Sequence, residues 1–222
     1  MDMVAVKPAA AARGAVTRGA LLDAAEALVA DQGYRQPSHR TIARAAAAHP
    51  ALVNYHFGSK EMLFEAALER RAARLNAAWD VALRAVQARP ARTVEDVLAA
   101  WWQPFADSDH HAERSWSNYL CIVARLASAA DGEAWRERHF GRIDRAFLDA
   151  LTAALPGARR EDVDAGFRYA RILFGEVLLV RCGRSGGSSC APGFRDGDVG
   201  RLIRYLASGL RGLARTIAAA AD

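Results

Sequence analysis

Apolar residues recur every three or four positions along most of the chain, which is the spacing that amphipathic α-helices require. The first clear repeat runs over residues 17–32, from Leu21 to Val29, and Gly33 stands where a helix of this kind would end. Pro90 and two polar or glycine-rich stretches separate the later repeats. The pattern predicts an all-α fold. Its later helices are predicted over about residues 93–107, 112–128, 131–155, 160–182 and 197–219.

Two short helices, at about residues 38–47 and 50–57, are predicted after the first one. Ser38 can cap the earlier helix, and Pro50 suits the first turn of the later helix, where its missing N–H costs nothing. Three helices, of which the last two are short and joined by a tight turn, have the outline of a helix-turn-helix unit. In such a unit the last short helix lies in the major groove of DNA.

A long helix is predicted directly after this unit. Gly58 is the expected C-cap of the second short helix, and Ser59 is the expected N-cap of a helix that continues to about Gln87. The N–H groups at Lys60 and Glu61 would give the start of this helix an attraction for anions.

The short helix at 50–57 has one side that suits packing and another that suits contact with DNA. Val53 and Phe57 are four residues apart and are predicted to face the core. Asparagine can form two hydrogen bonds with adenine, alanine can contact a thymine methyl group, and tyrosine, histidine and lysine can reach phosphate oxygens. Three-helix patterns also occur in proteins that never bind DNA, so the spacing alone leaves both interpretations open.

The stretch from Arg18 to Leu68 resembles the DNA-binding domain of the TetR family of transcriptional regulators. The similarity is carried by LLDAAEALVADQGY, SHRTIARAAA and above all ALVNYHFGSKEMLFEAAL. It implies an all-α homodimer, in which an N-terminal three-helix helix-turn-helix domain is joined to a C-terminal helical domain that binds a ligand and dimerises. It also implies a ligand-responsive regulator, most often a repressor, that leaves a near-palindromic operator in double-stranded DNA when a small molecule binds.

The resemblance assigns domains and DNA contacts to this chain. Residues 1–15 are expected to be a flexible arm, residues 16–62 the helix-turn-helix domain, and residues 63–222 the effector-binding and dimerisation domain. The residues that it implies as DNA contacts are Ser38, His39, Arg40, Pro50, Ala51, Asn54, Tyr55, His56 and Lys60.

The turn between the two short helices departs from the family pattern. Members of the family usually carry Gly-Val there, where this chain has Ala47 and Ala48. Alanine at a position with positive φ costs about 1 kcal/mol, so we expect a slightly remodelled turn. His49 stands where a small capping residue is common, and we expect it to cap the next helix or face solvent rather than contact a base.

The middle helices are rich in aromatic side chains, which suit either a helical core or an apolar ligand pocket. Because the resemblance implies a small-molecule effector, we expect a pocket for a small, apolar compound here. Arg171 is one candidate polar handle, and an arginine beside aromatic groups would suit a carboxylate on such a compound. The predicted pocket residues are Trp101, Trp102, Phe105, Trp116, Tyr119, Val123, Leu126, Phe147, Arg171 and Phe174.

The last two predicted helices carry the argument for a homodimer. Leucine residues form a stripe along the final helix, and the helix before it is apolar on more than one face. An ordinary monomeric bundle would also bury such helices, and the resemblance favours the dimer. The predicted interface residues are Phe167, Leu173, Val177, Leu202, Leu206, Leu210 and Leu213.

Composition adds constraints on location. The chain has 222 residues, 52% of them hydrophobic, with a net charge of +5, which permits an acidic partner. Apolar runs stop well short of about 20 residues, so no membrane-spanning segment is expected. Three cysteines at no metal-binding spacing, Cys121, Cys182 and Cys190, suit a reducing cytoplasm.

Other classes of protein receive little support. No Ser-His-acid order, HExxH or paired-cysteine motif indicates an enzyme. His110 and His111 are expected to be solvated, so we predict no metal, and the glycine-rich stretch at 182–200 lacks the strand and Lys-Ser/Thr of a nucleotide-binding loop, so we predict no cofactor. The alternatives are a TetR-type activator, or a helical small-molecule-binding protein or enzyme with a helix-turn-helix-like head.

Overall fold

The computed structural model describes residues 7–33, 35–106, 114–128, 132–181 and 196–218, and within these ranges all regular structure is helical. The predicted all-α fold is therefore confirmed. The helices are α1 (Lys7–Gln32), α2 (His39–Ala45), α3 (Ala51–Phe57), α4 (Lys60–Gln87), α5 (Val94–Ala106), α7 (Arg114–Ser128), α8 (Gly132–Ala153), α9 (Arg160–Arg181) and α10 (Asp196–Ala218).

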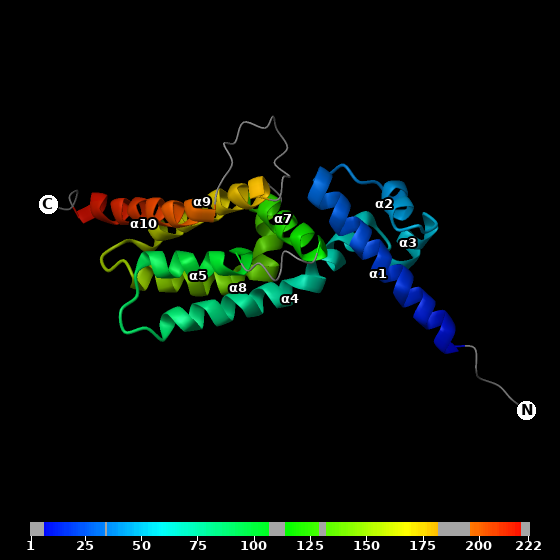
Figure 1. The fold of residues 1–222 in the computed structure, drawn as a ribbon, viewed down its shortest axis with the longest axis horizontal. Helices are drawn as coiled ribbons and strands as arrows, with labels where there is room; N and C mark the ends of the chain where they lie inside the picture. The colour runs from blue at the N-terminus through cyan, green and yellow to red at the C-terminus, as the bar shows by residue number, and fades with distance from the viewer. Residues whose placement is uncertain (1–6, 34, 107–113, 129–131, 182–195, 219–222) are drawn as a thin grey trace, which may run out of the picture.

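The molecule is elongated and has a head and a body (Figure 1). The head consists of α1, α2, α3 and the start of α4, and it lies at one end. The body contains α5, α7, α8, α9 and α10, with α4 running from the head along one edge and α9 and α10 forming the layer on the opposite side. No helix in the described ranges is both long enough and apolar enough to cross a membrane.

The first helix begins ten residues earlier than predicted, at Lys7 instead of Thr17. Residues 7–15 are therefore helical, and the expectation of a flexible arm over residues 1–15 is wrong for this part. The cause is local, because this stretch is dominated by alanine, which has the highest helix propensity, and Pro8 is tolerated in the first turn.

The apolar core of the molecule is continuous and extends from the body into the head. Leu21 from α1, Ile42 from α2 and Val53 from α3 are fully buried and belong to it. The predicted capping of α2 is confirmed: the Ser38 hydroxyl accepts a hydrogen bond from the Thr41 N–H at 3.2 Å, and the Thr41 hydroxyl accepts one from the Ser38 N–H at 2.8 Å. These contacts fix where α2 begins.

The turn from α2 to α3 is held by two unusual residues. Ala47 has a φ of 50°, so an alanine adopts the left-handed conformation that favours glycine. The Nδ1 atom of His49 accepts a hydrogen bond from the Ala51 N–H at 3.3 Å, and the side chain is exposed, which agrees with the expectation that His49 caps the next helix or faces solvent. Together they set the direction in which α3 leaves the turn.

The body is centred on Trp79 of α4. Its indole N–H donates a hydrogen bond to the Trp101 carbonyl oxygen at 2.8 Å, and the two rings stack with centroids 5.5 Å apart. The rings of Phe105 and Phe140 meet Trp79 edge-on. Because these residues come from α4, α5 and α8, the cluster fixes three helices of the body relative to one another.

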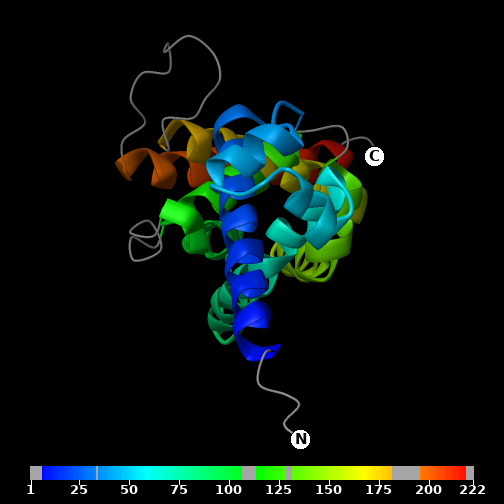
Figure 2. The same cartoon turned by 90° about the vertical axis from the view of Figure 1, so that its right-hand side faces the viewer.

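The head is tied to the body through α1, which crosses in front of the body when the molecule is viewed from the head (Figure 2). Glu26 of α1 is almost fully buried and accepts hydrogen bonds from Arg70 at 2.6 Å and from Arg71 at 3.1 Å, both on α4. Arg125 of α7 donates a hydrogen bond to the Ala30 carbonyl oxygen at 3.3 Å, near the end of α1. These contacts would therefore transmit a movement of α4 or α7 to α1.

Candidate DNA-binding and effector-binding sites

Helix α3 is packed from behind and open in front, as its sequence predicted. Val53 is fully buried, while Leu52 and Phe57 are partly buried and pack against the same core. The Arg18 guanidinium of α1 lies 5.1 Å from the centre of the Phe57 ring. Gly58, with a φ of 78°, ends the helix as predicted. The inner face of α3 therefore holds the helix against the rest of the head.

The outer face of α3 carries the predicted readers of DNA. Ala51 and Asn54 are exposed, and Tyr55 is 80% exposed, the most of any large hydrophobic or aromatic side chain noted on the described surface. His56 is half-buried, and its ring meets Tyr55 edge-on with centroids 5.0 Å apart. An exposed phenol braced by a neighbouring ring is ready to meet a phosphate without moving.

The start of α2 and the start of α4 flank this face. Arg40 on α2 is exposed, whereas His39 is half-buried and the Ser38 hydroxyl serves as a helix cap. Lys60 on α4 is half-buried, and its ammonium lies 5.7 Å from the centre of the Phe64 ring. These residues supply positive charge on both sides of α3.

The start of α4 is less open to an external anion than its sequence suggested. Ser59 caps the helix by accepting a hydrogen bond from the Met62 N–H at 3.1 Å. The backbone N–H of Glu61, followed by the Ser59 hydroxyl, lowers the pKa of the exposed Glu61 carboxyl. The chain therefore brings its own acceptors to these N–H groups, and the Lys60 side chain is the better candidate for phosphate contact.

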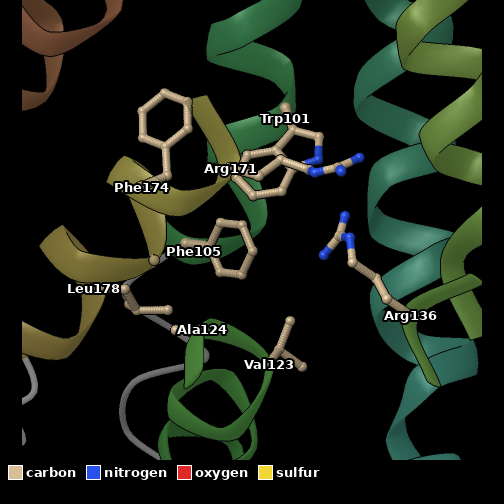
Figure 3. A pocket seen from close by; sticks show the side chains of 9 residues that line it. Trp101, Phe105, Val123, Ala124, Arg136, Arg171, Phe174 and Leu178 are labelled. Atoms are coloured by element: carbon tan, nitrogen blue, oxygen red, sulfur yellow. The ribbon is translucent and has the colours of Figure 1, made fainter. Parts of the chain in front are cut away.

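A cavity lies inside the body between α5, α7, α8 and α9 (Figure 3). Its volume is about 10 Å³, which is room for about one water molecule. Half of the predicted pocket residues line it: Trp101, Phe105, Val123, Arg171 and Phe174.

The other predicted pocket residues do not line this cavity. Trp102 lines a groove between α4 and α5, and Leu126 lines a separate hollow beside the start of α4. Trp116 and Tyr119 stack on each other with centroids 5.5 Å apart, and Phe147 stacks on Phe167. Trp116 lies two helical turns before Val123 on the same side of α7, next to α4, where the Arg74 guanidinium is 4.4 Å from the centre of the Trp116 ring.

Four residues that line the cavity were not predicted from the sequence: Ala124, Arg136, Gly175 and Leu178. Arg136 had a usable signal, because it falls on the buried stripe of α8 four residues before Phe140. A charged residue on an apolar stripe needs a buried partner, and Asp144 stands two turns later on the same helix. Gly175 lets α9 approach α7, since a Cβ there would lie 3.1 Å from the Ala124 carbonyl oxygen.

Two buried guanidinium groups dominate the electrostatics of the cavity. Arg136 is 3% exposed and Arg171 is 7% exposed. Asp144 accepts hydrogen bonds from Arg136 at 2.6 and 2.7 Å and from Arg171 at 3.2 Å. Burial, and next the charge of Arg136, lower the pKa of the Arg171 guanidinium, which remains charged near neutral pH.

The predicted dimer residues divide into two groups. Leu173 and Leu213 are exposed, and Val177 and Leu202 are partly exposed. The remaining three, listed here, are buried within the protomer and were wrongly assigned to a partner: Phe167, Leu206 and Leu210.

The close packing of α9 against α10 explains that error. A Cβ added to Gly166 would lie 2.3 Å from a methyl group of Leu210, so the absence of a side chain lets α10 sit tightly on α9. Leu206 and Leu210 of the leucine stripe are therefore buried inside the protomer. The outer face instead carries Tyr169, which is 58% exposed, and Tyr205, which is 71% exposed, neither of which was predicted.

Some sequence predictions concern residues outside the described ranges. These are residues 182–195 of the glycine-rich stretch predicted as a connector over 182–200, the solvated pair His110 and His111, and the cysteines Cys182 and Cys190. Residues 196–200 of that stretch are not a connector, because α10 begins at Asp196. Within the described residues, no group of three or more histidine, cysteine, aspartate or glutamate side chains could hold a metal ion.

Two family models match the chain. The model of bacterial regulatory proteins of the tetR family matches residues 21–67, and that of the tetracyclin repressor-like C-terminal domain matches residues 99–209. A curated relative, the HTH-type transcriptional regulator BetI of Rhizobium meliloti (strain 1021), is 28% identical over 164 residues, which cover 64% of this chain and 81% of that protein.

Solved structures share the fold. A TetR family transcription regulator from Marinobacter aquaeolei VT8 is 19% identical, with a TM-score of 0.54, covering 90% of this chain and 97% of that one. The fatty acid degradation regulator FadR from Bacillus halodurans is 16% identical, with a TM-score of 0.53, covering 88% and 95%. Both family models and the fold agree with the head and body described above, and the chain belongs to the TetR family of bacterial transcriptional regulators.

Proposed function

We propose that this protein is a cytoplasmic repressor that binds a near-palindromic DNA operator as a homodimer and is released from it by a small apolar effector. The observation that carries the proposal is α3, a short helix whose inner face is buried and whose outer face presents Asn54 and the 80% exposed Tyr55. Such a helix can enter a major groove while the rest of the head stays unchanged.

The proposed roles follow from side-chain chemistry. Asn54 reads a base, because its amide can donate to and accept from adenine at once. Tyr55, Arg40 and Lys60 contact phosphates, which fixes the register of α3 without reading the sequence. Ala51 lies on the same exposed turn as Asn54 and is small enough to meet a thymine methyl group.

The proposed release mechanism uses the helices that join the head to the body. The cavity is lined by α5, α7, α8 and α9, and α7 contacts the end of α1 through Arg125 and Ala30. An effector that enters the cavity must displace α7, and that displacement shifts the head through α1 and α4. Effector and operator then bind with opposing preference, and each weakens the other by the same factor.

The experiment that tests the proposal measures binding of the purified protein to duplexes selected from a random pool, at several salt concentrations. We expect the affinity to fall steeply as salt rises, because each phosphate contact releases counterions. Tyr55→Ala and Lys60→Ala should weaken binding to every duplex. Asn54→Ala should reduce the preference for one base pair by about 1–3 kcal/mol.

Met62→Ala is the matched control, because Met62 is 59% exposed on the first turn of α4 and is assigned no DNA contact. It should bind the selected duplex as the unmodified protein does. The proposal fails if the protein binds no duplex at low salt, or if Tyr55→Ala and Lys60→Ala both bind as tightly as Met62→Ala.

A further inference from the structure

The cavity in the body contains more positive than negative charge. In the described part of the chain, Asp144 is the only carboxylate that pairs with either Arg136 or Arg171. One carboxylate therefore hydrogen-bonds to two guanidinium groups that are each more than nine-tenths buried, while Glu133 and Asp164 attract Arg171 only from beyond ion-pair distance. An unbalanced charge inside a protein is costly, and it recruits a counter-charge where one can enter.

The hydrogen-bond donors in the cavity are also unbalanced. Nε of Arg136 and Nε1 of Trp101 are both buried, and neither finds an acceptor among the described residues. Both atoms carry a hydrogen, so what this cavity lacks is an acceptor. Buried donors normally have partners, which makes two such atoms on the lining of one cavity informative.

The two arginines face the cavity from opposite sides. Figure 3 shows the guanidinium of Arg136, from α8, and that of Arg171, from α9, pointing toward one another. Arg171 also lies 5.0 Å from the centre of the Phe167 ring, and Arg136 lies 5.9 Å from that of Phe140, so both are held in place by aromatic rings. The Asp144 carboxylate already accepts hydrogen bonds from both guanidinium groups, so a second planar acid would compete with it and use the N–H groups that Asp144 leaves.

The rest of the lining is apolar. Phe105, Phe174, Leu178 and Val123 are all buried and contribute only carbon atoms to the cavity. A ligand that satisfies this site therefore needs an anionic planar end for the arginines and an apolar remainder for these side chains.

We propose that the effector is a small apolar carboxylic acid, whose carboxylate binds between Arg136 and Arg171 and accepts hydrogen bonds from Arg136 Nε and Trp101 Nε1. This inference rests on the proposed function, in which the cavity binds the effector, and it adds the chemical class of that effector. The effector widens the cavity as it enters, since the present space holds about one water molecule.

The test compares acids with neutral and cationic analogues of the same shape. Phenylacetate, 4-phenylbutyrate, octanoate and indole-3-acetate are each titrated into the full-length protein beside their primary amides, and phenylacetate also beside phenethylamine. Binding is measured by calorimetry and by the shift in Tm, with sodium acetate at equal ionic strength as the control for general anion effects. We expect at least one acid to bind tenfold or more tightly than its amide, and the amine to bind most weakly.

Two variants make opposite predictions for the acid that binds. Arg136→Met leaves Arg171 paired with Asp144, so the charge is balanced, and we expect the affinity for the acid to fall tenfold or more while that for the amide stays within threefold. Asp144→Asn removes the competing carboxylate, and we expect the affinity for the acid to rise. If Arg136→Met does not fold, the proposal is still tested by whether Asp144→Asn raises or lowers the affinity for the acid.

The proposal is overturned if no acid binds better than its amide, if acetate has the same effect as the apolar acids, or if Asp144→Asn binds the acid more weakly. Binding to the selected DNA duplex is measured on the same preparation. If DNA binding holds and acid binding fails, only the class of effector is wrong, whereas loss of DNA binding would refute the proposed function whatever the ligands do.

Discussion

Ala47 is the only residue other than glycine with a positive φ in the described ranges. Its φ of 50° places it in the left-handed region, where a Cβ makes close contacts with its own backbone. The strain sits in the turn that aims α3, the helix proposed to enter DNA. The head therefore gives up stability at a position where glycine would relieve the strain.

Replacing this residue tests that statement. We expect Ala47→Gly to stabilise the protein by up to about 1 kcal/mol, because glycine adopts a positive φ without steric cost. Thermal and urea unfolding of the two proteins would measure the difference.

Ala45→Gly is the matched control, since Ala45 is exposed at the end of α2 with ordinary helical geometry. There glycine should destabilise by about 1 kcal/mol through the entropy of the unfolded chain. Equal destabilisation by both changes would show that the backbone at Ala47 is not strained.

Glu26 joins two helices, α1 and α4, through a nearly buried cluster. Its side chain is fully buried, while the side chains of Arg70 and Arg71 keep 29% and 15% of their surface exposed. Asp23 shares Arg70 at 2.7 Å but is itself 60% exposed. The same arginine therefore has one buried and one exposed acidic partner, which separates the effect of burial from that of charge.

Glu26→Gln should cost about 2–3 kcal/mol of unfolding free energy, because it leaves two partly buried cations without their shared carboxylate. Asp23→Asn should cost less than about 1 kcal/mol, since solvent already screens that pair. Urea unfolding measures both. Similar losses from the two variants would mean that the cluster is held by general charge attraction and not by the buried contact.

Most helices could be predicted from the sequence because their signals are local. Ser38, Gly58 and Ser59 act as caps where the pattern placed them, and the apolar repeat located α4 and α9 to within a few residues. The start of α1 could not be found in this way, because its first two turns have no apolar stripe and depend on alanine propensity alone.

The contacts between helices were harder to predict. On α9 and α10 some leucine and tyrosine side chains are exposed while others are buried, so the spacing of leucines on α10 does not tell which of them meet α9 and which meet solvent or a partner. The distinction depends on Gly166, whose missing side chain admits Leu210 from another helix. The aromatic residues of α5 and α7 could likewise be predicted as buried. Which neighbouring helix each side chain contacts depends on the packing against α4, α8 and α1, which the sequence does not show.

The outer face of α9 and α10 is the proposed site of a second copy of the chain. Leu173 is 40% exposed and Tyr205 is 71% exposed. Dimerisation through this face would bury their apolar surface away from water. Gly209 and Gly212 on α10 have open space at the position of a Cβ, and glycine inside an exposed helix costs about 1 kcal/mol each unless something packs closely there.

Leu173→Asp and Tyr205→Asp should therefore convert the protein to monomers and lower its affinity for a two-half-site operator far more than for a single half-site. Sedimentation velocity and binding to the two duplexes would measure this. Val81→Asp serves as the control, because Val81 is 61% exposed on α4, away from α9 and α10. A protein that is monomeric before any change would contradict the proposed assembly.

The cavity between α5, α7, α8 and α9 has room for about one water molecule, and all of its lining residues are buried. Any effector must wait for a fluctuation of the bundle before it can enter, however concentrated it is outside. The speed of induction then depends on how often the bundle opens, not on diffusion. Under the proposed function, a pulse of effector shorter than the opening time of the bundle would give a weaker response than a sustained supply.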